Sequence, residues 1–151
     1  MATQVDATGP VIVERAQYWP DPAPNWYEAH NSFGVTALAT KWGLAEGRVG
    51  TSANYQTYIL LANPGTVQAQ AVITFLRDGK PSLQKVFNMA PTSRFNVAIS
   101  GPGSMVPELV NETFGALIVC NQPIAVERAM YNDANGAVWA AGSSATAVPI
   151  P

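Results

Sequence analysis

Glycine and proline divide this sequence into short segments, and the residues between them favour β-strands. The chain holds 12 glycines and 12 prolines, and the intervening segments are rich in Val, Ile, Thr, Phe and Tyr. Short runs of strand formers bounded by turn residues are typical of sandwiches and of barrels, which give nearly the same pattern. No segment sustains the apolar spacing of a helix. We predict an all-β fold with very little helix: an antiparallel β-sandwich of about seven to nine strands, Greek-key or immunoglobulin-like.

The segment TVQAQAVITFL, residues 66–76, has the clearest strand pattern. Apolar and polar residues alternate along it, so one face of the strand would carry Val67, Ala69, Ala71, Ile73 and Phe75. An Asp78-Gly79 turn follows, and the segment PSLQKVFNM then runs back along the first. These features predict a two-stranded hairpin with one buried face.

Three further segments read as strands. YQTYILLAN, residues 55–63, is apolar on both faces, which predicts a central strand ended by an Asn-Pro-Gly turn. SRFNVAI, residues 93–99, alternates and would place its apolar residues inward. FGALIVC follows, after a loop that we expect to hold one helical turn at residues 106–110.

One four-residue phrase, Val-Glu-Arg-Ala, occurs near both ends of the chain. The first copy lies in VIVERAQYW, residues 11–19, and the second in IAVERAMYN, residues 124–132. A tyrosine follows two residues after the phrase in both copies. Both segments alternate in the manner of strands, and each copy is expected to be an edge element that needs a partner.

The sequences that follow the two copies are related but unequal. After the second copy, Asn135-Gly136 predicts a hairpin that would bring Tyr131 close to Trp139. After the first copy, the corresponding connection is longer and rich in proline. Residues 124–149 thus partly repeat residues 11–40, as in a tandem repeat that is cut away from its own boundary. We expect residues 1–10 to be a flexible N-terminal segment and residues 11–151 to form a single β-sandwich domain.

The order of several motifs resembles a known class of repeat. The motifs are VERAQYW and VERAMYN, then SFGVTALAT, WGLAEG, TYILLANPG and ITFLRDG. Together they resemble modules of roughly 110–120 residues, the size of one sandwich domain, found in tandem in large secreted or surface-attached bacterial proteins. The resemblance covers most of the chain between Val11 and Pro149, and it implies location and architecture only. One departure is that Asn132 stands where the first copy has Trp19, so the two copies need not do the same job.

Composition and charge exclude several classes of function. Charged residues make up 12% of the chain and the net charge is −2, and no basic stretch could neutralise nucleic-acid phosphates. No apolar run is long enough to insert into a membrane as a helix. The N-terminus lacks the basic and apolar regions of a secretory leader. Cys120 is the single cysteine and lies in a hydrophobic run, which predicts a buried, inert thiol.

The sequence predicts neither catalytic residues nor a cofactor. A hydrolytic triad needs a nucleophile, a base and an orienting acid, but the single histidine, His30, lies in a loop beside no recognisable nucleophile motif. One histidine and one cysteine cannot build a zinc site of the usual composition. No metal ligands are therefore expected, although a calcium site built from main-chain carbonyl oxygens stays open as an alternative.

The proline-rich connection after the first copy carries the strongest candidate for a binding site. Five aromatic or imidazole side chains lie in it or directly before it, within thirteen residues: Tyr18, Trp19, Trp26, Tyr27 and His30. Flat rings beside polar groups can stack on the faces of sugars, so a glycan is the leading ligand hypothesis. The alternative is structural, with these rings closing an open end of the sandwich or packing on a neighbouring module.

The two Glu-Arg pairs are interpreted as structural anchors. Adjacent residues on a strand point to opposite faces, so Glu14 cannot pair with Arg15, nor Glu127 with Arg128, while the strand stays regular. If the valine two positions earlier faces inward, each arginine does also, and a buried guanidinium needs a carboxylate or carbonyl partner. We expect these arginines to fix the strand register; a role in ligand binding is the alternative.

These observations favour a non-enzymatic structural or interaction module of a bacterial extracellular or cell-surface protein. Its expected partners are neighbouring repeat modules or a second copy of the chain, joined through edge strands. The alternative function is a carbohydrate-binding module that uses the aromatic loop.

Overall fold

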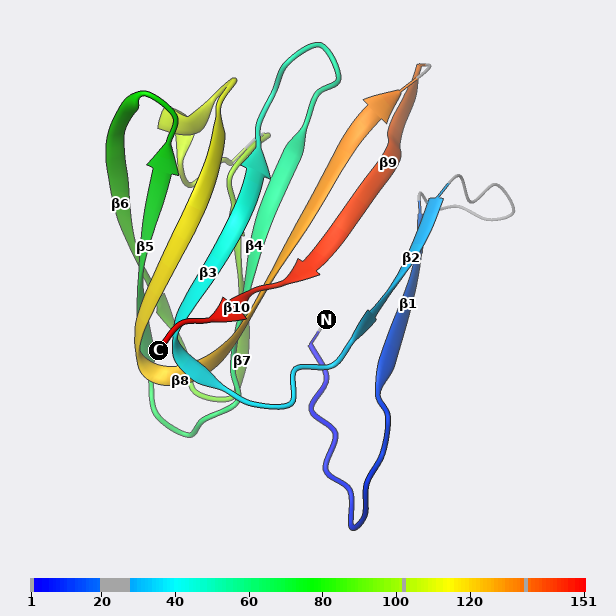
Figure 1. Ribbon diagram of the computed structural model, residues 1–151, viewed down its shortest axis with the longest axis vertical. Coiled ribbons are helices and arrows are strands. Elements are labelled where there is room, and N and C mark those ends of the chain that lie inside the picture. Colours follow the sequence, from blue (N-terminus) through cyan, green and yellow to red (C-terminus); the bar gives the residue numbers. More distant parts are fainter. Residues whose placement is uncertain (1, 20–27, 102, 135) are drawn as a thin grey trace.

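The structure is a computed structural model that describes residues 2–19, 28–101, 103–134 and 136–151, and its elements are almost all strands (Figure 1). Every strand pair is antiparallel, so the prediction of an antiparallel all-β sandwich is confirmed. The strands are β1 (Glu14–Trp19), β2 (Glu28–Phe33), β3 (Ala39–Arg48), β4 (Gln56–Asn63), β5 (Ala69–Arg77), β6 (Lys80–Met89), β7 (Ser93–Ala98), β8 (Thr113–Ala134), β9 (Ala137–Thr146) and β10 (Val148–Pro149).

Eight of these strands, β3 to β10, form the sandwich, and β8 belongs to both of its layers. The first half of β8 pairs with β3 and β5, which gives layer I the order β10-β3-β8-β5-β6. The second half pairs with β4 and β9, which gives layer II the order β7-β4-β8-β9. The main hydrophobic core lies between the layers and includes the fully buried side chains of Trp42, Phe75, Ile59, Leu61 and Ile118.

The crossing of β8 from one layer to the other includes Pro123. Its pairing with β5 ends at Cys120, and its pairing with β4 begins at Ala125. The intervening residues Asn121, Gln122 and Pro123 have no partner in either ladder. Because proline lacks a backbone N–H, this is the part of a long strand where it costs no ladder hydrogen bond.

The predicted hairpin of β5 and β6 is confirmed. Ala71 pairs with Phe87 and Phe75 with Leu83, and the turn glycine Gly79 has a φ of 63°, which glycine adopts without strain. The buried face of β5 is the predicted one from Ala69 onward, with exposed fractions of 0%. Val67 does not belong to it: the strand begins two residues later, and Val67 is 57% exposed.

β4 is a central strand, as predicted, with β7 on one side and β8 on the other. It ends at Asn63, whose side-chain Oδ1 accepts a hydrogen bond from the backbone N–H of Gly65 and so holds the predicted turn. The expected helical turn is also present, as a 3₁₀ helix at Pro107–Leu109. Cys120 is buried, in agreement with its hydrophobic context.

The second copy of the phrase leads into the predicted β8–β9 hairpin. Asn135 lies outside the described residues, but Ala134 pairs with Ala137 across the turn. The expected approach of Tyr131 and Trp139 is confirmed, since their rings stack with centroids 5.2 Å apart.

The two copies of the phrase take different places in the fold. The first forms β1, which pairs with β2 in a separate two-stranded sheet, the β1–β2 hairpin (Figure 1). Residues 11–13 precede this strand and are exposed. The second copy lies inside layer II, with β4 on one side and β9 on the other. The expectation that both copies are edge elements is therefore wrong for the second, because the hairpin that follows it folds back along its free side.

Candidate functional site

The β1–β2 hairpin packs against the outer face of layer II and buries a polar and aromatic cluster there. On β1, the side chains of Arg15, Gln17 and Trp19 face layer II, and His30 lies opposite Gln17 on β2. Alternation along β8 presents Glu127 and Tyr131 to them. We call this set of residues the hairpin cluster; it consists of Arg15, Gln17, Trp19, His30, Glu127, Tyr131, Trp139 and Ser144.

Two side-chain interactions join the first copy of the phrase to the second. Arg15 Nη1 lies 3.0 Å from Glu127 Oε2 in an ion pair. Gln17 Nε2 donates a hydrogen bond of 3.1 Å to the hydroxyl oxygen of Tyr131. Both contacts join the hairpin to β8, and the anchor role expected of Arg15 and Glu127 stays a prediction.

Tyr131 is the centre of the aromatic part of the cluster. Its ring stacks on Trp139, and it meets Trp19 edge-on with centroids 5.4 Å apart. His30 meets Trp19 at 5.3 Å. Gly142 of β9 makes this approach possible, because a Cβ at that position would lie 2.8 Å from Tyr131 Cδ1 and 2.9 Å from Trp19 Cζ2.

Several buried polar atoms of the cluster have no hydrogen-bond partner among the residues that the structure describes. They are Arg15 Nε and Nη2, Trp19 Nε1, both ring nitrogens of His30, Trp139 Nε1 and Ser144 Oγ. Buried polar groups are normally paired, and leaving one unpaired costs about 1–3 kcal/mol. Most of these atoms are donors, so the cluster has an unused capacity to bind hydrogen-bond acceptors.

Burial sets the charge state of the histidine in the cluster. Desolvation lowers the pKa of His30 below its usual value of 6.5, and the nearby positive charge of Arg15 lowers it further. The carboxylates of Glu127 and Glu28 act in the opposite direction but are outweighed. His30 is therefore neutral near pH 7, and the Arg15–Glu127 pair is close to neutral as a whole.

Arg128, the other predicted anchor, lies on the opposite side of β8 from the cluster. It is 6% exposed and points inward between the layers, where its Nη1 donates a hydrogen bond of 3.1 Å to Ser143 Oγ. Burial lowers the pKa of this guanidinium, and the carboxylate of Glu46 partly offsets the effect. The inward arginine expected from the strand pattern is thus present in the second copy, and Glu14 of the first copy is exposed.

The structure divides the aromatic residues that the sequence grouped together. Trp19 and His30 belong to the cluster, whereas Tyr18 is 55% exposed on the other face of β1. Trp26 and Tyr27 lie outside the described residues. The sequence interpretation missed Tyr131, Trp139 and Ser144 as members of the site, although the Asn-Gly hairpin signal had already placed two of them together.

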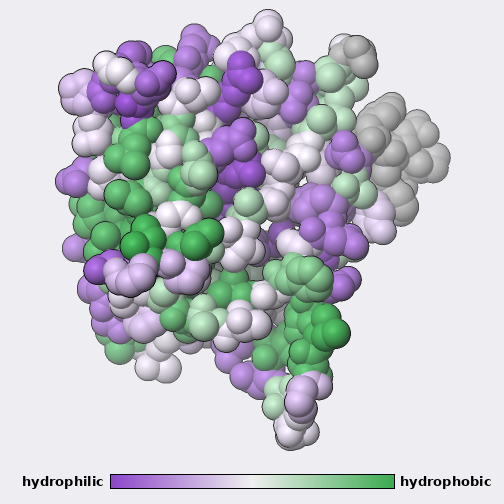
Figure 2. Space-filling model, viewed as in Figure 1, coloured by the Kyte–Doolittle hydropathy of each residue, from purple (hydrophilic) through white to green (hydrophobic). Residues whose placement is uncertain are grey.

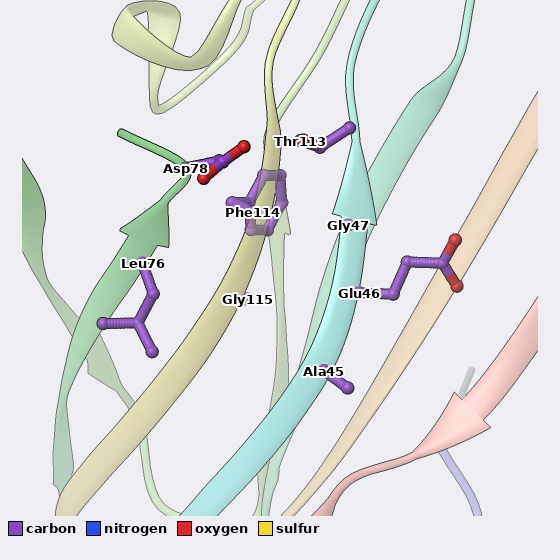
Figure 3. Close-up of a pocket in the computed structure, with 8 residues that line it drawn as sticks. All are labelled: Ala45, Glu46, Gly47, Leu76, Asp78, Thr113, Phe114 and Gly115. Atoms are coloured by element: carbon purple, nitrogen blue, oxygen red, sulfur yellow. The ribbon is translucent and has the colours of Figure 1, made fainter. Parts of the chain in front are cut away.

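A shallow depression of about 200 Å³ lies elsewhere, at the ends of β3, β5 and β8. Two carboxylates line it, but Glu46 points away from Asp78 and from the ring of Phe114 (Figure 3). Across the described ranges, no three His, Cys, Asp or Glu residues come together as a potential metal site. Nor does the described part of the chain contain a helix with the length and apolar character to span a membrane.

Comparisons with known proteins support the fold and leave the function open. No protein-family model and no curated protein matches the chain. The crystal structure of Thermotoga maritima 1070 is similar with a TM-score of 0.64 and 14% identity, over 75% of this chain and 96% of that one. The Anabaena sensory rhodopsin transducer is similar with a TM-score of 0.50 and 20% identity, over 63% and 86%. At these identities the likeness extends to the fold alone.

Proposed function

We propose that this chain is a non-enzymatic structural or interaction module of a bacterial extracellular or cell-surface protein. The observation that carries the proposal is the docking of the first copy of the repeated phrase on the second through the Arg15–Glu127 ion pair. The two copies of the phrase thus contact each other through their side chains. In a tandem protein, the same contact would join neighbouring modules.

Edge strands offer a second way for such a module to associate. Among the described strands, β6 pairs only with β5, and β7 pairs only with β4. An unpaired strand edge presents backbone donors and acceptors that can accept a strand from another chain. Self-association by edge-strand pairing is therefore part of the proposal, with edges such as β6, β7 and β9 available rather than the second copy.

Truncation tests whether the docked hairpin has a structural role. The full chain would be compared with a chain lacking residues 1–19, and a chain lacking residues 1–10 serves as the control because it keeps β1. Loss of β1 uncovers the face of layer II. We therefore expect a lower melting temperature and a changed oligomeric state by light scattering. If truncation to residue 20 leaves both unchanged, the first copy has no structural partner and the proposal fails.

Carbohydrate binding is the second candidate function, and the unpaired hydrogen-bond donors of the hairpin cluster favour it. The indole N–H groups of Trp19 and Trp139, and Nε and Nη2 of Arg15, are donors without partners among the described residues, beside the ring of Tyr131. Sugar hydroxyl oxygens are suitable acceptors, and aromatic rings stack on sugar faces. The near-neutral charge of the cluster suits a neutral saccharide better than an anion.

A glycan array with matched variants tests this candidate. Trp19→Phe keeps an aromatic ring but removes the indole N–H, and Tyr18→Phe changes an aromatic residue on the other face of β1. We expect binding to weaken in the first variant and to persist in the second. An array on which the unmodified protein binds no polysaccharide would rule the candidate out.

A further inference from the structure

The outer face of layer I carries a continuous row of exposed apolar side chains. Val72 of β5 pairs with Val86 of β6 on one side and with Val119 of β8 on the other. Val86 is 56% exposed and Val119 is 51% exposed. Leu76 and Leu117 extend the patch along the same two strands, with 45% and 39% exposure. Figure 2 shows the hydrophobic side chains gathered over this layer.

The two outer faces of the sandwich differ in how they are covered. The β1–β2 hairpin covers part of layer II, whereas the described residues place no element over the valine row of layer I. An antiparallel sheet that faces water usually alternates apolar residues inside with polar residues outside. Here valines occupy neighbouring outward positions on β8, β5 and the edge strand β6, and a large exposed apolar patch of this kind marks an interaction site.

The chemistry of this face fits a second copy of the same chain. Polar residues that share the face with the valine row include Gln70, Thr74 and Gln84, which are uncharged. Lys41 stands opposite Val119 at one side, and its ammonium group donates to the carbonyl oxygen of Pro151. Near a two-fold axis, each group faces its own copy on the partner. Charged groups there would therefore face like charges, whereas an uncharged centre avoids this repulsion.

The size of the face is also sufficient for a specific contact. Four strands about 4.8 Å apart, each about nine residues long at about 3.3 Å per residue, cover roughly 600 Å² together with the two-residue β10. Two such faces would bury roughly 1,200 Å² in total, the lower end of the range for specific protein–protein interfaces. Sheets also pack face to face readily, about 10 Å apart with their strands roughly aligned.

We propose that two copies of this chain associate as a two-fold dimer through the outer faces of layer I, with Val72, Val86 and Val119 at the centre. The inference rests on the proposed role as an interaction module and names both the surface and the partner. It replaces edge-strand pairing by face-to-face packing as the principal mode of self-association.

Charge substitutions at the centre of the face test the dimer. Sedimentation equilibrium of the full chain over a concentration series would give the dimer dissociation constant. Val119→Lys places two ammonium groups near the axis, and we expect the dissociation constant to rise at least about tenfold. Val67→Lys is the matched control, because Val67 is similarly exposed but lies outside the sheet, and it should leave the constant unchanged. Circular dichroism and the melting temperature show whether each variant is folded.

Mixing oppositely charged variants makes the test specific to this face. Val119→Asp and Val119→Lys should each be monomeric, and an equimolar mixture should recover the dimer mass. A monomeric unmodified chain, or dimers that persist in both charged variants, would overturn the inference. If the dimer is instead lost on removing residues 1–19 but survives the Val119 substitutions, the hairpin is the contact; the proposed function then stands and this inference does not.

Discussion

Arg15 and Glu127 form an ion pair of 3.0 Å between residues 112 positions apart in the sequence, and they come from different positions of the same repeated phrase. Adjacent residues of a strand face opposite sides. The first copy therefore presents its arginine side to layer II, and the second copy presents its glutamate side to the hairpin. Opposite sides of the phrase are complementary in charge, whereas identical sides would repel each other.

A double-mutant cycle measures the contribution of this ion pair to the free energy of unfolding. Arg15→Ala, Glu127→Ala and the double variant would be compared by urea unfolding. The side chains are 41% and 21% exposed, so solvent screens the pair, and we expect a coupling energy of about 0.5–1 kcal/mol. A coupling energy near zero would mean that other contacts, such as Gln17 with Tyr131, position the hairpin.

Gly142→Ala should separate the hairpin from layer II. The added methyl group would lie within 3 Å of both Tyr131 and Trp19, so the aromatic packing must shift, at a cost of about 1–3 kcal/mol. The emission of buried Trp19 should move to longer wavelength as water reaches it. Gly9→Ala is the control, because no heavy atom lies within 4 Å of a Cβ there. Equal effects of the two substitutions would contradict the packing described for the cluster.

His30 should make folding stability depend on pH near neutrality. Its pKa in the folded protein is below 6.5, so the unfolded chain takes up the proton first as the pH falls. Stability is therefore lost as the pH drops below about 6.5, and the loss levels off below the folded pKa. Unfolding in denaturant between about pH 7.5 and 5.5 would measure this dependence.

The variant His30→Gln supplies the control for that measurement, since it removes the titrating group. The lowered pKa values of Asp133, Glu108 and Glu112 act in a different range, because their contributions are lost only as the pH falls through those acidic pKa values. The slope between neutral and mildly acidic pH should vanish in His30→Gln. A slope that persists there would assign the effect to another group.

Arg128 should act through packing rather than through its charge. It is buried between the layers with Ser143 as its hydrogen-bond partner. Replacing a buried charge by an apolar residue of similar volume is often neutral, whereas leaving a cavity is costly. We expect the free energy of unfolding of Arg128→Met to lie within about 1 kcal/mol of that of the native chain. Arg128→Ala should be clearly less stable, as measured by calorimetry. If Arg128→Met is the more damaging change, the guanidinium has a role beyond filling space.

Local sequence signals were sufficient where the decisive contacts are local. The β5–β6 hairpin follows from alternation together with the Asp78-Gly79 turn, and that turn sets the pairing of the two strands with each other. The approach of Tyr131 and Trp139 follows from a two-residue turn in the same way. In these segments, register is determined within about 20 residues of sequence, so the pattern and the structure agree.

The composition of the hairpin cluster depends on contacts that the sequence pattern does not encode. The face of β1 that becomes buried is chosen by contacts with β8, more than 100 residues away, and both faces of β1 carry an aromatic residue. Alternation alone does, however, separate Tyr18 from Trp19, because neighbouring residues cannot share a face. Grouping them as one platform overlooked this rule.

The continuity of β8 has a consequence for how the molecule opens. Because one backbone supplies ladder hydrogen bonds to both layers, neither layer can detach without disrupting the other, and amide protons in both should exchange with solvent in the same global event. The β1–β2 hairpin shares no ladder with the sandwich across the described residues and is held by side chains. It is therefore the unit that can lift away while the rest stays folded, which would give the first copy of the phrase access to a neighbour.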